Sequence, residues 1–191
     1  ETKLISTLNE ENLPHLEKTF VPARLLLGPG PSNANPEVLK ALSLNPIGHL
    51  DEAYIDLMSD VQKLLRYTWQ CNNRITLPMS GTGSAAMEAS IANFIEPGEK
   101  ILIAKKGYFG DRLVDMASRY QADVIVIDKE WGEVFTFEEI KYAIETNKPA
   151  IFAIVHAETS TGVLQPLNGI GDVCRKNNCL FLVDAVTSLG A

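Results

Sequence analysis

Short apolar runs alternate with segments of helical pattern along most of this chain, and that alternation limits the folds open to it. The runs fall at residues 75–79, 100–104, 122–127, 150–155 and 179–183. Apolar runs of this length, separated by helical segments, are typical of buried parallel strands joined by crossover helices. The sequence therefore predicts an α/β fold with a doubly wound, mostly parallel sheet.

Helix signals occupy the stretches between these runs. Asn35 before Pro36 predicts the start of a short helix, and Asp51 precedes a longer segment with apolar residues at helical spacing. Thr136 with Glu139 forms a capping box for a helix that runs to about residue 146. Further helices are expected over residues 85–94, 111–120 and 167–177.

The composition excludes some classes of partner. The 191 residues carry a net charge of -7 and contain no block of Lys and Arg, so nucleic acids and anionic membranes are poor candidates. No apolar run approaches membrane-spanning length. The three cysteines form no CxxC pair, which favours reduced thiols and a cytoplasmic location over a disulfide framework or a zinc site.

The two ends of the chain suggest a longer polypeptide. The sequence starts without Met and without a signal-peptide pattern. Residues 187–191 leave the last expected strand without the covering helix that a buried parallel strand needs. We therefore expect the first part of a larger protein, with a complete small domain that ends on an edge strand as the alternative.

The segment from Ser80 to Ser84 has the features of an anion-binding turn. It leads from an expected strand into a helix, and its two glycines allow tight backbone geometry. The free N–H groups of a first helical turn favour a phosphate, and the hydroxyls of Thr82 and Ser84 add donors. The segment is neither a GxGxxG fingerprint nor a P-loop.

Asp184 directly follows the last apolar run, which places it at the carboxyl end of a buried strand, where open α/β sheets bind ligands. No second acid or histidine lies near it in sequence, so a metal site is not expected. A carboxylate here is suited to pair with a protonated heterocyclic nitrogen, the partner that a pyridoxal phosphate ring requires.

Other polar and aromatic residues follow the remaining strands. Tyr108 lies in a glycine-flanked segment that leaves room for a flat ligand against its ring. His156 stands at a strand end and is either a base or a structural residue. Lys105, Lys106 and Arg112 are interpreted as a small solvated basic cluster.

Four segments together resemble the class V branch of the fold-type I pyridoxal-phosphate enzymes, within it the alanine–glyoxylate and serine–pyruvate aminotransferase group. They are residues 25–32 (LLLGPGPS), 80–84 (SGTGS), 158–166 (ETSTGVLQP) and 182–190 (LVDAVTSLG). The resemblance implies a fold-type I large domain that is incomplete at its carboxyl end. Residues 1–35 would form an amino-terminal arm and the active-site entrance, and residues 36–191 the front part of the large domain.

The resemblance also implies roles for single residues. Those expected to bind pyridoxal 5′-phosphate are Thr82, Gly83 and Ser84 on the phosphate, Tyr108 stacked on the ring, Thr159 near the ring hydroxyl, Asp184 on the pyridine nitrogen and Val186 on the opposite ring face. Tyr108 departs mildly from the family pattern, which more often has Trp. The segment Gly28-Pro29-Gly30 would border the substrate entrance.

The implied activity is transamination between a small amino acid, alanine or serine, and a 2-oxo acid, glyoxylate or pyruvate. The family's Schiff-base lysine and its carboxyl-terminal small domain would lie beyond residue 191. Members are homodimers, which fits an irregular arm at the start. The location is expected to be cytoplasmic, or peroxisomal if the source is eukaryotic.

Three alternatives remain open. Another class V enzyme would be a kynurenine-pathway transaminase, a phosphoserine aminotransferase or a cysteine desulfurase. A non-catalytic dimerising module would bind no cofactor. A nucleotide-binding α/β domain is disfavoured, because both phosphate fingerprints are missing from the sequence.

Overall fold

The computed structural model describes residues 21–190, and the chain divides into two compact units, residues 1–45 and 46–191. The described part of the first unit contains one helix, α1 (Pro36–Leu42). The side chain of Asn35 accepts a hydrogen bond from the backbone N–H of Glu37, and Pro36 occupies the first helical position, as the sequence predicts.

The second unit begins with α2 (Glu52–Trp69), which Asp51 caps through the N–H of Ala53. It is followed by α3 (Gly83–Phe94), which starts two residues before the predicted position. Within the described chain, no helix combines the length and the apolar character that a membrane crossing requires.

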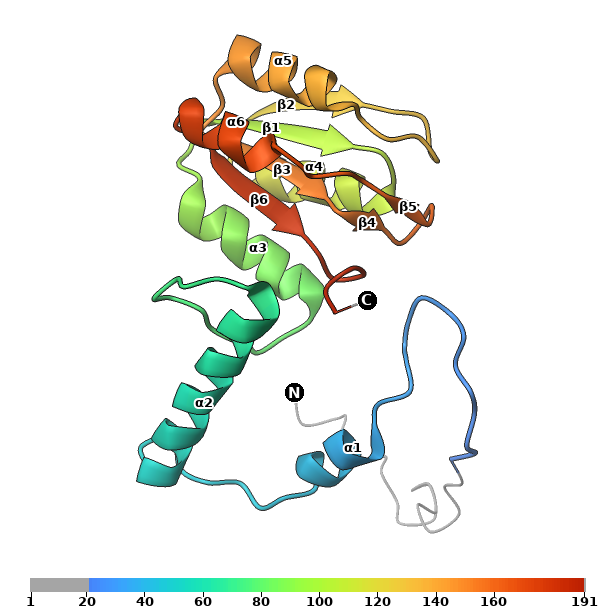
Figure 1. Ribbon diagram of the computed structural model, residues 1–191, viewed down its shortest axis with the longest axis vertical. Helices are drawn as coiled ribbons and strands as arrows, with labels where there is room; N and C mark the ends of the chain where they lie inside the picture. The colour runs from blue at the N-terminus through green and yellow to red at the C-terminus, as the bar shows by residue number, and fades with distance from the viewer. Residues whose placement is uncertain (1–20, 191) are drawn as a thin grey trace, which may run out of the picture. The chain divides into compact units, whose positions relative to one another are not determined.

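The sheet has four parallel strands in the order β2-β1-β3-β6 (Figure 1). The strands are β1 (Lys100–Lys105), β2 (Asp123–Asp128), β3 (Ile151–Val155) and β6 (Leu180–Asp184). Each lies within one residue of its predicted bounds. The helices that connect them are α4 (Tyr108–Arg119), α5 (Phe137–Asn147) and α6 (Ile170–Lys176).

Alternate residues of the central strands face two separate apolar layers. Leu102 of β1 and Phe152 of β3 pack in the layer of α5 and α6. Ile103 and Ala153 pack in the layer of α3 and α4. Because successive side chains of a strand point to opposite faces, this division places helices on both faces of the sheet (Figure 1). The predicted doubly wound α/β architecture is confirmed.

One predicted strand is wrong. Residues 75–79 form an irregular segment without strand pairing, and Ile75, Leu77 and Met79 are more than half exposed. A strand needs a neighbouring ladder, and none of the described strands runs beside this segment. Pro78 also lacks the N–H that such a ladder would use.

A small antiparallel ribbon was not expected from the sequence. It consists of β4 (Ala157–Glu158) and β5 (Val163–Leu164), joined by a turn in which Gly162 has φ 72°. The carbonyl of Glu158 accepts hydrogen bonds from the N–H groups of Thr161 and Gly162. This ribbon extends the chain beyond the end of β3 and fixes the position of Glu158.

Candidate functional site

A cavity of about 160 Å³ lies where α3 begins and where β3 and β6 end. Its walls come from four separate segments of the second unit. They are lined by Thr82, Gly83, Ser84, Met87, Phe109, Val155, Ala157, Thr159, Asp184, Val186 and Thr187. Most of the residues that the sequence singled out for a cofactor therefore share one cavity, at the sheet edge where open α/β folds bind ligands.

The start of α3 is suited to an anion. Thr82 is the residue before the helix, and its side chain makes no capping hydrogen bond within the described structure. The N–H groups of Ala85 and Ala86 bond to the carbonyl of Thr82. The backbone N–H groups that a ligand would meet are therefore those of Gly83 and Ser84. The hydroxyls of Thr82 and Ser84 line the same cavity.

Asp184 brings a carboxylate to this cavity from the last residue of β6. Its Oδ1 atom accepts a hydrogen bond of 3.0 Å from the N–H of Val186, which fixes the turn after the strand. A carboxylate has about four acceptor sites, so this single bond leaves capacity for a cationic group of a ligand.

Val186 and Thr159 complete the predicted set within the cavity. Val186 packs so close to α3 that a Cβ added at Gly83 would lie 3.0 Å from its Cγ2 atom. The hydroxyl of Thr159 is hydrogen-bonded to that of Thr187. These two contacts tie the turn after β6 to both neighbouring walls.

Tyr108, the predicted ring-stacking residue, is not among the residues that line the cavity; its neighbour Phe109 is. Tyr108 is half exposed, and its ring meets that of Phe109 edge to face with 5.4 Å between centroids. Gly28, Pro29 and Gly30 belong to the first compact unit, whereas the cavity is built from the second. The roles given to these four residues stay predictions.

A residue that the sequence did not mark as structural, Glu158, caps α4 from a distance. Its buried carboxylate accepts hydrogen bonds of 3.3 Å from the N–H groups of Phe109 and Gly110. Ser160 adds a bond of 3.0 Å from the N–H of Tyr108 to its hydroxyl. The first turn of α4 is thus saturated by the β4–β5 turn, which explains why the helix begins three residues before the predicted position.

Close packing at Gly107 accompanies this cap. A Cβ at Gly107 would lie 2.4 Å from Cγ of Glu158 and 2.7 Å from the hydroxyl of Ser160. A glycine at this position is therefore required for the carboxylate to reach the helix.

The interpretation of Lys105, Lys106 and Arg112 as a solvated cluster is wrong. Lys106 is buried, donates to the carbonyl of Val163 at 3.3 Å, and has a pKa below its ordinary value because burial disfavours its charge. Lys105 forms ion pairs of 2.9 and 3.2 Å with Asp111 and Asp128. Arg112 donates hydrogen bonds to the hydroxyls of Ser84 on α3 and Tyr108 on α4.

His156 has a structural partner. Its Nδ1 atom lies 2.9 Å from the hydroxyl of Ser188, and its backbone N–H donates to the carbonyl of Asp184. Among the described residues, no group of three or more His, Cys, Asp or Glu side chains is placed to hold a metal ion.

A second cavity of about 430 Å³ adjoins the first and shares Gly83, Met87, Asp184 and Val186 with it. Its remaining walls are largely apolar and include Trp69, at the end of α2. Asp184 therefore lines two adjoining cavities, one at the start of α3 and one beside β6.

The fold and the site define a class of α/β proteins that bind a small anionic ligand at the carboxyl ends of parallel strands. The family model for class V aminotransferases matches residues 25–191. The chain belongs to the class V aminotransferase family, as its sequence motifs indicate.

Similar proteins agree with this family. The chain is 44% identical to an alanine–glyoxylate aminotransferase from Mus musculus, over 89% of this chain and 41% of that protein. It is 42% identical to a (S)-ureidoglycine–glyoxylate transaminase from Bacillus subtilis, over 88% of this chain and 41% of that protein. It thus spans less than half the length of these curated relatives.

A solved structure shows the same fold. The crystal structure of an alanine–glyoxylate aminotransferase from Nostoc sp. matches with a TM-score of 0.91 and 59% identity, covering 97% of this chain and 49% of that one. The predicted fold-type I architecture is consistent with this agreement of backbone and sequence.

Proposed function

We propose that this chain forms the cofactor-binding part of a pyridoxal-phosphate-dependent aminotransferase that acts on a small amino acid and a 2-oxo acid. One observation carries the proposal: the uncapped start of α3 and the carboxylate of Asp184 line the same cavity. Family membership and the names of the similar proteins support it.

The residues present fit this cofactor. A phosphate suits the N–H groups and hydroxyls of Thr82, Gly83 and Ser84, and a protonated ring nitrogen suits Asp184. Val155, Phe109 and Val186 supply apolar surface for a flat ring between these ends. Thr159 offers a hydroxyl for the ring oxygen.

When bound, the cofactor supplies a ring that accepts electrons from the substrate carbon undergoing deprotonation. Asp184 would keep a proton on the ring nitrogen, because a neighbouring negative charge favours the charged form of that nitrogen. The first turn of α3 would hold the anionic end of the cofactor. The apolar walls exclude water from the ring faces.

The similar proteins point to glyoxylate as the amino acceptor, since both the alanine–glyoxylate and the ureidoglycine–glyoxylate enzymes carry it in their names. We propose alanine or serine as the donor and glyoxylate or pyruvate as the acceptor. A kynurenine-pathway, phosphoserine or desulfurase activity has no observation in its favour.

The proposal extends to assembly and location. We propose that residues 1–35 form an arm and entrance segment in which Gly28, Pro29 and Gly30 border the substrate, that residues 36–191 belong to the large domain, and that the protein is a cytoplasmic homodimer. Exposed apolar side chains on α1 and α2 support the proposed homodimer. Leu39, Leu42 and Leu64 are each more than half exposed.

The replacement Asp184→Asn tests the function in the protein made from its complete natural reading frame. We expect transamination of alanine with glyoxylate to fall by about 100-fold or more, because an amide does not hold the ring nitrogen protonated, while the cofactor still binds. Asp123→Asn, at the exposed first residue of β2, is the matched control and should keep full activity. Full activity of Asp184→Asn would refute the role given to this acid.

A further inference from the structure

Arg112 links the two parts of the site that the sequence treated separately. It lies in the second turn of α4, and its Nη1 atom donates a hydrogen bond of 2.6 Å to the hydroxyl of Ser84 on α3. Its Nη2 atom donates to the phenolic oxygen of Tyr108 at 3.2 Å. One guanidinium therefore bridges the anion-binding turn and the aromatic residue.

The direction of these bonds is fixed by chemistry. A guanidinium has donors only, so Ser84 accepts from Arg112 and keeps its own hydroxyl proton for another acceptor. Ser84 lines the cavity at the start of α3. Arg112 thus presents Ser84 as a donor toward the place where an anion would lie, and a positive charge stands directly behind that donor.

The same side chain holds the aromatic pair. The central carbon of the guanidinium lies 5.1 Å from the ring centroids of both Tyr108 and Phe109, within the range of a cation–π contact. Phe109 lines the cavity, and the ring of Tyr108 meets that of Phe109 edge to face. The position of both rings therefore depends on Arg112 as well as on the cap that Glu158 supplies.

We propose that Arg112 is a positioning residue that makes the site selective for a ligand with a phosphate group, by orienting Ser84 and by locking Tyr108 to the same turn. This inference rests on the proposed function and adds a residue outside the predicted cofactor set. The phenolic oxygen of Tyr108 takes part, which a Trp at this position would not offer. A purely structural bridge between α3 and α4 is the competing explanation.

The test compares two ligands that differ only in the phosphate. The cofactor-free protein, made from its complete natural reading frame, is titrated with pyridoxal 5′-phosphate and with pyridoxal, and binding is followed by absorbance. For Arg112→Met we expect the Kd of pyridoxal 5′-phosphate to rise about tenfold, as for loss of a charge-assisted hydrogen bond, and that of pyridoxal to change less than about twofold. Arg112→Lys should recover part of the loss.

Two further variants keep the inference testable if Arg112→Met does not fold. Ser84→Ala should give a similar selective loss, and Arg112→Lys in the Ser84→Ala background should add less than it does alone, because the bond between these two side chains is already lost. Arg119→Met, on the same helix with an exposed guanidinium that pairs with Asp115, is the matched control.

The outcomes separate the two claims. Equal losses for both ligands, or additive effects of Ser84→Ala and Arg112→Lys, would mean a structural bridge and would overturn the inference alone. Failure of the unaltered protein to bind pyridoxal 5′-phosphate would overturn the proposed function and the inference with it.

Discussion

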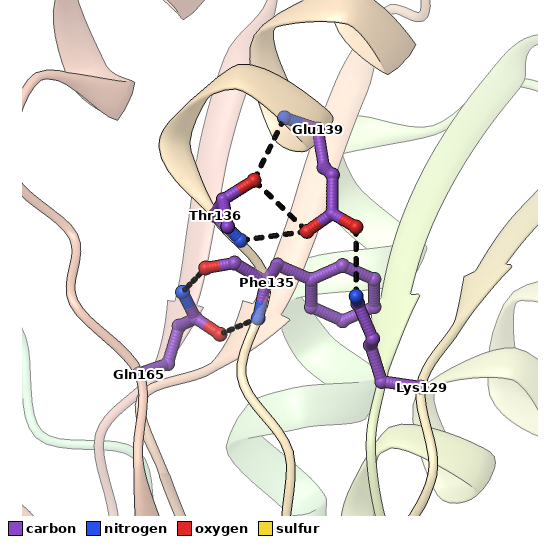
Figure 2. Close-up of polar contacts among 5 residues, drawn as sticks. All are labelled: Lys129, Phe135, Thr136, Glu139 and Gln165. Carbon is purple, nitrogen blue, oxygen red and sulfur yellow. Dashed lines mark hydrogen bonds and ion pairs between the residues drawn. The ribbon is translucent and has the colours of Figure 1, made fainter.

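The starts of α5 and α3 differ in one respect that separates a structural helix from a ligand-binding one. At α5 the capping side chains are fully engaged, as Figure 2 shows. At α3 the residue in the same position, Thr82, makes no capping bond within the described structure. Both are threonines with extended backbones, so the residue type alone does not set the difference.

The capping side chains at the start of α5 are held by partners within the protein. The hydroxyl of Thr136 accepts from the N–H of Glu139, and the carboxylate of Glu139 accepts from the N–H of Thr136 and from Lys129. Gln165, wholly buried, pairs with both the N–H and the carbonyl of Phe135 (Figure 2). The capping side chains there are thus engaged with one another and with neighbouring protein groups.

At α3 the same groups face a cavity instead. Its N3 position holds Ala85 in place of a Glu, so no side chain is available to close the turn. Binding capacity at a helix start is therefore preserved by leaving out a capping partner. The start of α3 lacks the small stabilisation of a side-chain cap, which is what the proposed phosphate site requires.

The largest expected effect comes from closing the space at Gly107, which destroys the cap that Glu158 provides to α4. Gly107→Ala would place a Cβ 2.4 Å from Cγ of Glu158, and we expect a loss of about 2–3 kcal/mol in the free energy of unfolding. Urea unfolding measures it. Gly48→Ala is the control, because nothing lies within 4 Å of a Cβ there. Equal losses for both variants would contradict the distant cap.

A matched pair of cap substitutions tests the comparison directly. Thr136→Ala should cost about 1 kcal/mol, because it removes a capping box. Thr82→Ala should change the stability of the cofactor-free protein by less than about 0.5 kcal/mol, because no cap bond is lost. Similar losses from the two variants in urea unfolding would show that Thr82 caps α3 as Thr136 caps α5.

The smallest expected effect is the pH dependence of the α5 cap. The hydrogen bond from Lys129, with those from Thr136, lowers the pKa of Glu139 to about 2. A depressed folded-state pKa means that the stabilisation is present above the ordinary value near 4.5 and is lost as the pH falls toward 2. Glu139 is almost half exposed, so solvent screening keeps the effect below about 1 kcal/mol.

The measurement is the difference in unfolding free energy between the unaltered protein and Glu139→Gln at pH 7 and at pH 3. It should shrink at the lower pH. Glu138→Gln, in the same helical turn but more exposed, controls for general loss of negative charge. A difference that stays constant between the two pH values would count against the proposed origin of the shift.

The sequence predicted those parts of the fold and site that depend on local pattern. The strands around residues 100–105 and 180–184 and the capping box at Thr136 follow from apolar runs and residue types, and the structure confirms them. Asp184 was singled out because it follows a buried strand, and open α/β sheets bind ligands at the carboxyl ends of their strands. Thr82 was singled out from its glycine-flanked turn at the start of a helix, although the strand expected before it does not form.

What the sequence missed depends on contacts between distant segments. Glu158 reads as a loop acid until the β4–β5 turn brings it to the start of α4. Arg112 reads as a surface charge until α3 and α4 pack together and its guanidinium meets Ser84. The burial of Lys106 and the close packing at Gly107 likewise appear only once these segments meet.

Asp184 is the last residue of β6, which among the described strands is hydrogen-bonded to a neighbour on one side. Among the described strands, β6 is laddered only to β3, and the final pairing is Val155 with Asp184. The last pair of a strand with one neighbour opens more readily than the middle of β1, which has neighbouring strands on both sides. The positional order of the Asp184 carboxylate, and the strength of any charge pair that it forms, therefore depend on what packs against the outer edge of β6.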